Sequence, residues 1–248
     1  MEILGIDIGG SSLKGGLVNI KTGEINGATH RITTPNSRKP EDIAQSVDEM
    51  LDHFNYSGLV GCGFPSIIKN GVCKHPGNLH ADWVGVSVDK LFQEVTGQAF
   101  TMLNDADAAG IAEMRFGAGQ NEKGLVVTIT VGTGLGSGAY LNGELIPNFE
   151  LGQIPYKEFI KIEDWAASSI KTSQNLSYEE WGKRFDTFLN YIQRIICPDL
   201  LIIGGGISND WDKFVHFLNQ DVRMIPAKLR NDSGIIGAAV AAAEKVEY

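Results

Sequence analysis

The stretch Asp7-Ile8-Gly9-Gly10-Ser11-Ser12-Leu13-Lys14 decides the fold. It follows an apolar run over residues 2–8 that predicts a buried strand, and a second strand is expected over residues 13–20. The two glycines between these strands allow a positive φ and a close approach of the backbone to a ligand. Backbone N–H groups that converge in such a turn form an anion-binding nest. The turn therefore predicts a phosphate site at the end of the first strand.

The same arrangement occurs a second time. Gly9 corresponds to Gly132, 123 residues later, where the β-rich run 125–131 leads into Gly132-Thr133-Gly134-Leu135-Gly136. A glycine-spaced strand and a reverse turn follow in both copies. The economical interpretation is a duplicated β-β-β-α-β unit around a cleft. The paired turns favour a polyanionic phosphoryl donor, whereas two tight turns that need glycine only for packing are the alternative.

Helices are expected where apolar residues recur at helical spacing, and strands where short apolar runs end in glycine. The expected helices cover residues 41–54, 88–95, 105–116, 181–196 and a final stretch from about 234. The further expected strands cover residues 24–33, 57–64, 99–103 and 200–203.

The composition is that of an ordinary globular protein. The 248 residues are 43% hydrophobic and 21% charged, so neither disorder nor a coiled coil is expected as the main state. The formal net charge of −9 does not favour binding to nucleic acid or to a membrane. There is no long apolar run and no signal peptide at the N-terminus. The expected location is the cytoplasm.

The cysteines are Cys62, Cys73 and Cys197, without a CxxC pair. An odd number without metal-ligand spacing is typical of thiols in a reducing compartment. We therefore expect three buried, reduced side chains.

Polar residues follow the apolar run that ends at Leu103. Asn104-Asp105-Ala106-Asp107 places an amide and two carboxylates where a strand passes into a helix. A helix cap explains one acid, and Asp107 is expected to be charge in the first helical turn. Asp105 can accept a proton from a hydroxyl nucleophile that Asn104 orients. The stretch therefore predicts a general base beside a hydroxyl substrate.

Glu150 and Gln153 supply another carboxylate and amide after Pro147. A single glutamate in a loop is usually solvated. Sugar recognition, in contrast, needs carboxylates that accept pairs of hydroxyl groups. Both interpretations stay open at this point.

Five motifs together resemble the ROK family of sugar kinases. They are residues 7–14, Leu103-Asn-Asp-Ala-Asp-Ala-Ala-Gly110, Thr133-Gly-Leu-Gly136, Glu150-Leu-Gly152 and Pro198-Asp-Leu-Leu-Ile-Ile-Gly-Gly-Gly206. Residues 104–117 and 226–239 are most similar to the branch that uses polyphosphate. The resemblance implies an α/β, two-lobed actin-like ATPase fold of the ribonuclease H-like type. The lobes would cover residues 1–104 and 105–232, with a final helix, 233–248, returning to the N-terminal lobe.

The family's motifs imply a role for each matching residue. Asp105 would be the general base on the 6-hydroxyl of glucose, and Asp7 would hold Mg²⁺ through water. The sugar would be bound by Asn78, Asn104, Asp105, Glu150 and Gln153. The donor phosphates would be bound by Gly9, Gly10, Ser11, Ser12, Lys14, Thr133, Gly134, Gly204, Gly205 and Gly206, the last three toward the far end of the donor.

Two features depart from the usual family pattern. Gln153 stands where most members have histidine, so the sugar specificity is open. In many members that histidine and a cysteine cluster bind structural zinc. No cysteine lies between Cys73 and Cys197, so no structural zinc is expected, as in the polyphosphate branch. No helix-turn-helix segment precedes Met1, which argues against the family's DNA-binding repressors.

The resemblance implies an enzyme that transfers a phosphoryl group from inorganic polyphosphate, or also ATP, to the 6-hydroxyl of glucose, giving glucose 6-phosphate. The expected cofactor is Mg²⁺, the partners are a small sugar and polyphosphate or nucleotide, and the assembly is a homodimer. One alternative is an ATP-dependent hexokinase of the same family that acts on glucose or another hexose. The other is a non-catalytic sugar sensor, against which Asp105 and both phosphate turns count.

Polyphosphate has no base or ribose, so it must be held by charge along its length. Because the net charge is −9, basic residues must be concentrated near the cleft. Arg115, Lys228 and Arg230 are the candidates for a groove that leads from the phosphate turns.

Overall fold

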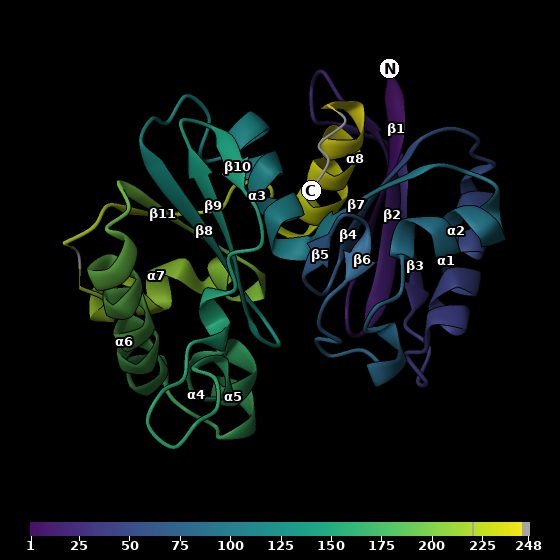
Figure 1. Ribbon diagram of the computed structural model, residues 1–248. Helices are drawn as coiled ribbons and strands as arrows, with labels where there is room; N and C mark the ends of the chain where they lie inside the picture. The colour runs from purple at the N-terminus through teal and green to yellow at the C-terminus, as the bar shows by residue number, and fades with distance from the viewer. Residues whose placement is uncertain (220, 245–248) are drawn as a thin grey trace. The chain divides into compact units, whose positions relative to one another are not determined.

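A computed structural model describes residues 1–219 and 221–244 of the chain (Figure 1). The chain divides into two compact units, each with its own sheet and core. The first comprises residues 1–112 and the stretch from Asp232 onward, and the second comprises Glu113–Asn231. The sequence analysis places the boundary at residues 104 and 105, at the start of the helix within which the observed division falls.

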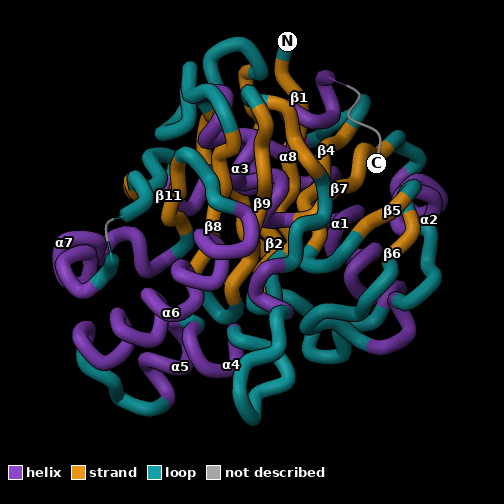
Figure 2. The backbone as a smooth tube through the Cα atoms, turned by 60° about the vertical axis from the view of Figure 1, so that its left-hand side comes forward, coloured by secondary structure: helices purple, strands orange, loops and turns teal. Residues whose placement is uncertain are grey.

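The first unit contains a five-stranded sheet in the order β3-β2-β1-β4-β7. Figure 2 draws strands in orange and labels β1, β2, β4 and β7 of this sheet. Its central strand β1 pairs antiparallel with β2 and parallel with β4, and β4 pairs parallel with β7. The strands are β1 (Glu2–Ile8), β2 (Ser12–Asn19), β3 (Ile25–Thr33), β4 (Val60–Phe64) and β7 (Phe100–Asn104), with a small hairpin of β5 (Ile68–Lys69) and β6 (Val72–Cys73).

The second unit repeats this topology in the order β10-β9-β8-β11-β12. Again the central strand, β8, pairs antiparallel with the following strand and parallel with β11, and β11 pairs parallel with β12. The strands are β8 (Leu125–Val131), β9 (Leu135–Leu141), β10 (Glu144–Ile146), β11 (Leu200–Gly204) and β12 (Met224–Pro226). The repeated order confirms the predicted duplication, with Gly9 and Gly132 at the ends of equivalent strands.

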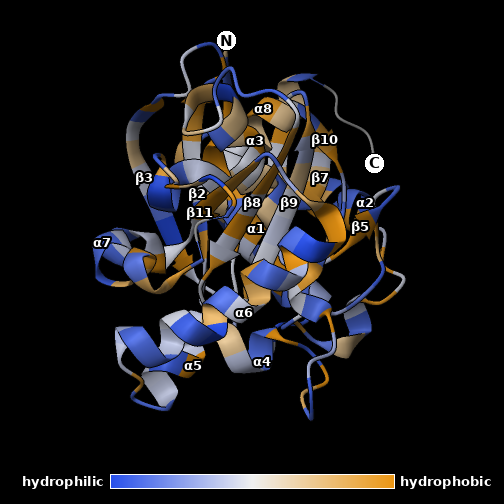
Figure 3. Cartoon of the chain, turned by 90° about the vertical axis from the view of Figure 1, so that its left-hand side faces the viewer, coloured by the Kyte–Doolittle hydropathy of each residue, from blue (hydrophilic) through white to orange (hydrophobic). Residues whose placement is uncertain are grey.

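The helices of the first unit pack on both sides of its sheet. They are α1 (Pro40–Phe54), α2 (Val88–Thr96), α8 (Ser233–Glu244) and the first part of α3 (Asp105–Phe116). Nearly every residue of α8 is buried, and Figure 3 shows this helix mostly in the apolar colours. It lies directly on the strands, because a Cβ on Gly5 or Gly61 would come within 2.0 or 1.8 Å of helix carbonyl oxygens. Residues 245–248 of the predicted final helix lie outside the described residues.

One long amphipathic helix, α6 (Tyr178–Ile196), covers the second sheet. Trp181, Phe185 and Phe188 on its inner face are fully buried. Its first turn is closed by a capping box, in which the side chains of Ser177 and Glu180 each bond the other residue's backbone N–H. The short helices α4 (Glu163–Ala166), α5 (Ser168–Ser173) and α7 (Trp211–Phe214) were not predicted, because four to six residues are too few to display a helical period.

The cysteines differ in exposure. Cys62 and Cys73 are buried as expected, but Cys197 is exposed, so the prediction of three buried thiols is wrong. Cys197 follows α6 as its C-cap, with a left-handed φ of 52°. Within the described residues no helix is both long and apolar enough to cross a membrane.

Candidate active site

The parallel strands of the first sheet bring two carboxylates to one edge. The register pairs Asp7 of β1 with Gly63 of β4, and Gly63 with Leu103 of β7. Asn104 and Asp105 follow Leu103 in the sequence. Their backbone therefore lies two strands away from that of Asp7, a distance of about 10 Å across the sheet. Ligands of such sheets bind outside the carboxyl ends of the strands. This edge is therefore the part of the candidate site that belongs to the first unit.

The first glycine turn is held from both sides. The N–H of Gly9 donates to the carbonyl of Ser12 at 3.0 Å, and the Thr34 hydroxyl donates to the carbonyl of Gly9 at 2.7 Å. The positive φ that glycine allows is absent from Gly9 and Gly10. A Cβ at position 9 would lie 3.0 Å from the Ser12 carbonyl oxygen, so a larger residue there would be tightly packed. Ser12 is buried and Ser11 is exposed, so of the two hydroxyls that of Ser11 is accessible.

Asp7 lies beside this turn and opposite Lys14 on the neighbouring strand. The Lys14 ammonium group is 3.9 Å from the Asp7 carboxylate, which is about 20% exposed. Burial raises the pKa of the Asp7 carboxyl, and the positive charge of Lys14 lowers it by less. Gly234 at the start of α8 leaves room for this group, because a Cβ there would lie 2.8 Å from the Asp7 carboxyl carbon.

Asn104 caps α3. Its side-chain oxygen accepts hydrogen bonds from the N–H groups of Ala106 at 2.8 Å and Asp107 at 3.1 Å. Its amide nitrogen donates to the carbonyl of Ser66 at 3.3 Å. The sequence analysis gave the capping role to an acid, but the amide performs it, because Asn104 is the residue that immediately precedes the helix. These contacts fix the end of β7 beside the loop that follows β4.

Asp105 and Asp107 stand in the first turn of α3. Asp105 is partly exposed, and one of its oxygens accepts the N–H of Ala106 at 2.8 Å. Asp107, in contrast, is only 1% exposed. Asp107 lies in the first turn of the helix as predicted, but the sequence did not indicate that it would be buried. Asp105 is the carboxylate in position to meet a substrate.

The loop that carries Asn78 lies on the same side of the first unit. The backbone carbonyl of Asn78 accepts a hydrogen bond from the Arg38 guanidinium at 2.8 Å, and its side chain is exposed. A Cβ on the preceding Gly77 would lie 2.3 Å from the Pro65 carbonyl oxygen. Because Asn104 bonds the neighbouring Ser66, this loop is connected to the Asn104-Asp105 stretch through residues 65 and 66.

In the second unit, Glu163 organises the glycine turn at the end of β8. Its carboxylate accepts the N–H of Leu135 at 3.0 Å, and a Cβ on Gly134 would lie 2.3 Å from it. Ser168 and Ser169 donate hydroxyl hydrogen bonds to the carbonyls of Gly132 and Thr133, at 2.9 and 2.7 Å. The turn is therefore rigid, with its carbonyls already occupied.

Glu163 also connects this turn to the loop of Glu150 and Gln153. The Gln153 amide nitrogen donates to Glu163 at 3.0 Å, and Lys161 forms an ion pair with Glu163 at 2.6 Å. Burial raises the pKa of the Glu150 carboxyl, and the negative charge of Glu163 raises it further. Glu150 is half-buried, which argues against the interpretation of a solvated surface glutamate.

Sequence reasoning missed Glu163. A lone glutamate before a short, unpredicted helix gives no signal by itself. Only the folded structure indicates its role, because Glu163 is the first residue of α4 and its carboxylate lies next to Gly134. The short distance between Gly134 and this acid exists only in the folded structure.

The loop Gly204–Gly206 lies against the end of β8. Gly205 has a φ of 79°, and a Cβ there would lie 2.4 Å from the Val131 carbonyl oxygen. Gly205 is therefore the position among the predicted phosphate-binding glycines where a positive φ is observed. Ser208 closes the loop with a hydroxyl hydrogen bond to the Gly205 carbonyl at 2.8 Å. The loop and the Gly132–Gly134 turn are thus neighbours within the second unit.

The predicted site residues therefore form two groups. The first unit holds Asp7, Gly9, Gly10, Ser11, Ser12, Lys14, Asn78, Asn104 and Asp105; the second holds Thr133, Gly134, Glu150, Gln153, Gly204, Gly205 and Gly206. Within the described residues, no three His, Cys, Asp or Glu side chains gather as a ready-made metal site. A single carboxylate such as Asp7 still suits Mg²⁺, which keeps several waters and takes further ligands from substrate phosphates.

Comparison with known proteins gives consistent matches. The ROK family profile matches residues 3–148. A "Polyphosphate glucokinase" of Mycobacterium tuberculosis is 42% identical over 240 residues, covering 96% of this chain and 89% of that protein. The crystal structure of "Inorganic Polyphosphate/ATP-Glucomannokinase" from Arthrobacter sp. strain KM superposes with a TM-score of 0.94, at 35% identity, over 98% of this chain and 99% of that one. A Streptomyces griseus ROK glucokinase solved with glucose and AMPPNP shares the fold at a TM-score of 0.83 and 21% identity, over 98% of this chain and 100% of that one.

Proposed function

The chain belongs to the ROK family, and we propose that it transfers a phosphoryl group from inorganic polyphosphate or ATP to the 6-hydroxyl of glucose. The observation that carries the proposal is the likeness to a polyphosphate glucokinase along nearly the whole chain. The arrangement of the sheet edges supports it, because carboxylates and glycine turns stand at the strand ends where a sugar and a phosphate donor would be bound.

The residues that we propose to bind glucose are taken unit by unit. Asp105, Asn104 and Asn78 contribute from the first unit, and Glu150 and Gln153 contribute from the second. Carboxylates suit this task since each accepts hydrogen bonds from two hydroxyls. Asn104 is held firmly in place, because its oxygen caps α3 and its amide nitrogen donates to the carbonyl of Ser66.

The donor is bound by the glycine turns. The turns at Gly9–Ser12 and Thr133–Gly134 offer backbone N–H groups, and Lys14 offsets phosphate charge. Asp7 would hold Mg²⁺ through water, and the ion, when bound, neutralises negative charge on the donor phosphates. The burial that raises the pKa of Asp7 is opposed by Lys14, which favours the charged carboxylate that this role requires.

The chemical step requires that the sugar hydroxyl and the donor phosphate are positioned for reaction and that the hydroxyl proton is removed. Asp105 accepts the proton of the 6-hydroxyl as the oxygen attacks the terminal phosphorus in line with the leaving phosphate. Its place at the first turn of α3 keeps the carboxylate fixed by the N–H of Ala106. The base therefore needs little reorientation when the sugar arrives.

The test is a coupled assay for glucose 6-phosphate with polyphosphate and ATP compared side by side, with Mg²⁺ present and then removed by chelation. We expect turnover with polyphosphate and glucose that depends on Mg²⁺. Formation of glucose 6-phosphate from neither donor would overturn the proposal. Activity with ATP alone would replace it by an ATP-dependent hexokinase.

Mannose is the second sugar to test. The Arthrobacter protein is named a glucomannokinase, and Gln153 stands where most family members have histidine. We propose that this chain also phosphorylates mannose. The assay above, repeated with mannose and N-acetylglucosamine, measures this preference directly.

The homodimer and the cytoplasmic location rest on the family resemblance and on the composition. Size-exclusion chromatography with light scattering tests the first, and fractionation of the source cells tests the second. Neither outcome affects the chemistry proposed above.

A further inference from the structure

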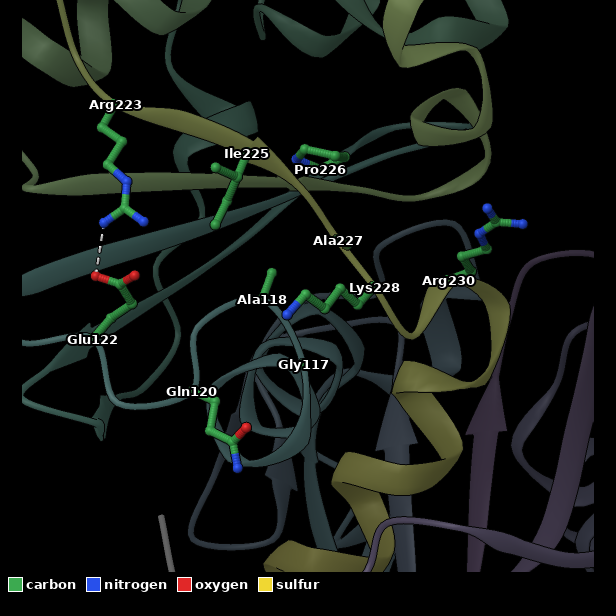
Figure 4. A pocket seen from close by; sticks show the side chains of 10 residues that line it. All are labelled: Gly117, Ala118, Gln120, Glu122, Arg223, Ile225, Pro226, Ala227, Lys228 and Arg230. Carbon is green, nitrogen blue, oxygen red and sulfur yellow. Dashed lines mark hydrogen bonds and ion pairs between the residues drawn. The ribbon is translucent and has the colours of Figure 1, made fainter.

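A cavity of about 590 Å³ lies along the edge strand β12 in the second unit (Figure 4). One wall is the loop after α3, from Gly117 to Glu122. The other wall is β12 with the segment that follows it, which carries Arg223, Lys228 and Arg230. Arg115 does not line this cavity.

The cavity is positively charged in a chain whose net charge is −9. Arg223 forms an ion pair with Glu122 at 2.9 Å, which neutralises one end. Within the described part of the chain, the ammonium group of Lys228 has no ion-pair partner. Figure 4 shows it extending toward Ala118, whereas Arg230 extends to the other side of the same segment. The cavity therefore has a net positive charge at the end near Lys228.

The walls of the cavity are held together by Glu113, which is 2% exposed. Its carboxylate accepts the N–H of Ala118 at 2.8 Å, of Lys228 at 3.1 Å and of Leu229 at 2.7 Å. Three bonds from two separate segments to one buried carboxylate fix the distance between the walls. The shape of the cavity is therefore set by the fold.

The cavity begins next to the predicted donor loop. Gly205 lies against Val131, the residue before Gly132, as described above. Gly204 lies beside Ala227, because a Cβ added to Gly204 would be 3.3 Å from the Cβ of Ala227. The N–H of Ala227 donates to the carbonyl of Ile203 at 2.9 Å. Ala227 also lines the cavity. A continuous route therefore runs from the phosphate turn across the strand ends of β8, β11 and β12 to Lys228.

We propose that this cavity binds the distal phosphates of a long polyphosphate chain while its terminal phosphate reaches the turn at Thr133. This inference rests on the proposed function and extends it. The route crosses two strand spacings, about 10 Å, and then continues along β12. A linear polyanion can follow it, because each phosphate carries charge, whereas a short donor ends before Lys228. Lys228 and Arg230 thus bind the distal phosphates of long chains and do not contact a short donor.

The experiment compares donors of different length in a double variant, Lys228→Gln with Arg230→Gln. The readout is the ratio of kcat/KM for long-chain polyphosphate to kcat/KM for tripolyphosphate or ATP, measured at low and at high salt. We expect the ratio to fall about tenfold at low salt, because the charge contacts of two exposed side chains are lost. The salt dependence of the long-chain reaction should become shallower. Direct binding of long-chain polyphosphate, by isothermal titration, should weaken by a similar factor.

The matched control is Lys183→Gln with Arg194→Gln. Both residues are exposed on α6 of the same unit, and neither lines the cavity. This variant removes the same charge and should keep the wild-type ratio. Equal ratios in wild type and the Lys228 variant, with normal long-chain activity, would overturn the cavity proposal alone. A wild-type protein that binds polyphosphate but makes no glucose 6-phosphate would overturn the proposed function and leave the cavity supported.

Discussion

The two sheets have the same strand order but carry different groups at equivalent strand ends. When Gly9 is placed on Gly132, Asp7 of the first sheet corresponds to Thr130 of the second. The parallel registers then place Asn104 and Asp105, at the end of β7, on Lys228 and Leu229, which follow β12. The first sheet thus presents the carboxylate of Asp7 where the second presents a hydroxyl, and an amide and a carboxylate where the second presents a cation and a leucine.

This difference indicates a division of labour on one duplicated scaffold. Carboxylates at strand ends can remove a proton and hold a metal ion, whereas a cation and free N–H groups can only bind an anion. In the second unit the carboxylate of Glu150 comes instead from the loop after β10, and that of Glu163 from the start of α4. Duplication therefore supplied the positions, and the side chains at those positions separate the chemistry of the two units.

The sheets also differ in how a helix covers them. In the first, Gly5 and Gly61 are register partners and admit the backbone of α8. The equivalent pair in the second is Thr128 and Ile202, which fill the space with side chains. Equivalent positions therefore have opposite steric requirements.

The largest expected effect comes from Asp105→Asn, which removes the base and keeps the shape. Turnover should fall by roughly 10²–10⁴, the usual contribution of general base catalysis. Glucose binding, measured by titration calorimetry, should stay within about tenfold of wild type, since one hydrogen bond changes its character. Asp52→Asn, an exposed acid on α1, is the control. Near-normal turnover of the Asp105 variant would show that the carboxylates of the first sheet do not perform the chemistry.

The second effect concerns Gly61→Ala and its counterpart Ile202→Ala. The added Cβ would lie 1.8 Å from the Ala238 carbonyl oxygen, so α8 must shift and the free energy of unfolding should fall by about 3 kcal/mol. Ile202 is 1% exposed, so its truncation should leave a cavity and cost about 2–5 kcal/mol. Hydrogen exchange should rise in α8 for the first variant and in β11 for the second.

Gly10→Ala is the control for this pair, because a Cβ there meets nothing within 4 Å. It should leave the urea unfolding midpoint almost unchanged. If Gly61→Ala behaved like Gly10→Ala, the close approach of α8 would not be the reason for glycine in the first sheet.

The sequence predicted the duplicated unit and most of the long elements, because hydrophobic periodicity and the repeated glycine turns are local signals. The helix 105–116 and the strand 125–131 have the predicted bounds. It could not predict the burial of Asp107 or the role of Glu163, because both depend on residues distant along the chain.

The third effect concerns Glu150→Ala, which leaves sugar hydroxyls without a partner. The KM for glucose should rise by about tenfold or more and kcat should fall less, because a lost hydrogen bond to a charged group costs about 1.5–3 kcal/mol. Glu158→Ala, an exposed acid in the same loop region, is the control. Equal KM values for both variants would remove Glu150 from the sugar site.

The same residue predicts a pH dependence. Burial and Glu163 raise the pKa of Glu150, so it takes up a proton at a higher pH than a free glutamate does. Sugar binding needs the charged form, and kcat/KM for glucose should therefore decline on the acid side. Glu163→Gln removes the repulsion and should move this decline to lower pH. If the pH of this decline were the same in the Glu163 variant as in wild type, the decline would be caused by the titration of another group.

The smallest effect is expected from Gln153→His, which tests whether the loop of Glu150 and Gln153 in the second unit determines the sugar specificity. Gln153 is exposed and donates to Glu163 at 3.0 Å, and an imidazole N–H can replace that bond. We expect kcat/KM for glucose to stay within about threefold, as for most surface changes. The ratio of mannose to glucose use should shift by more than that, because histidine reaches the sugar with different geometry. Gln174→His, an exposed residue of the same unit bonded to Arg184, should leave the ratio unchanged. If both histidine variants gave the wild-type ratio, sugar choice would reside in the first unit, and the division of labour between the sheets would be sharper than we propose.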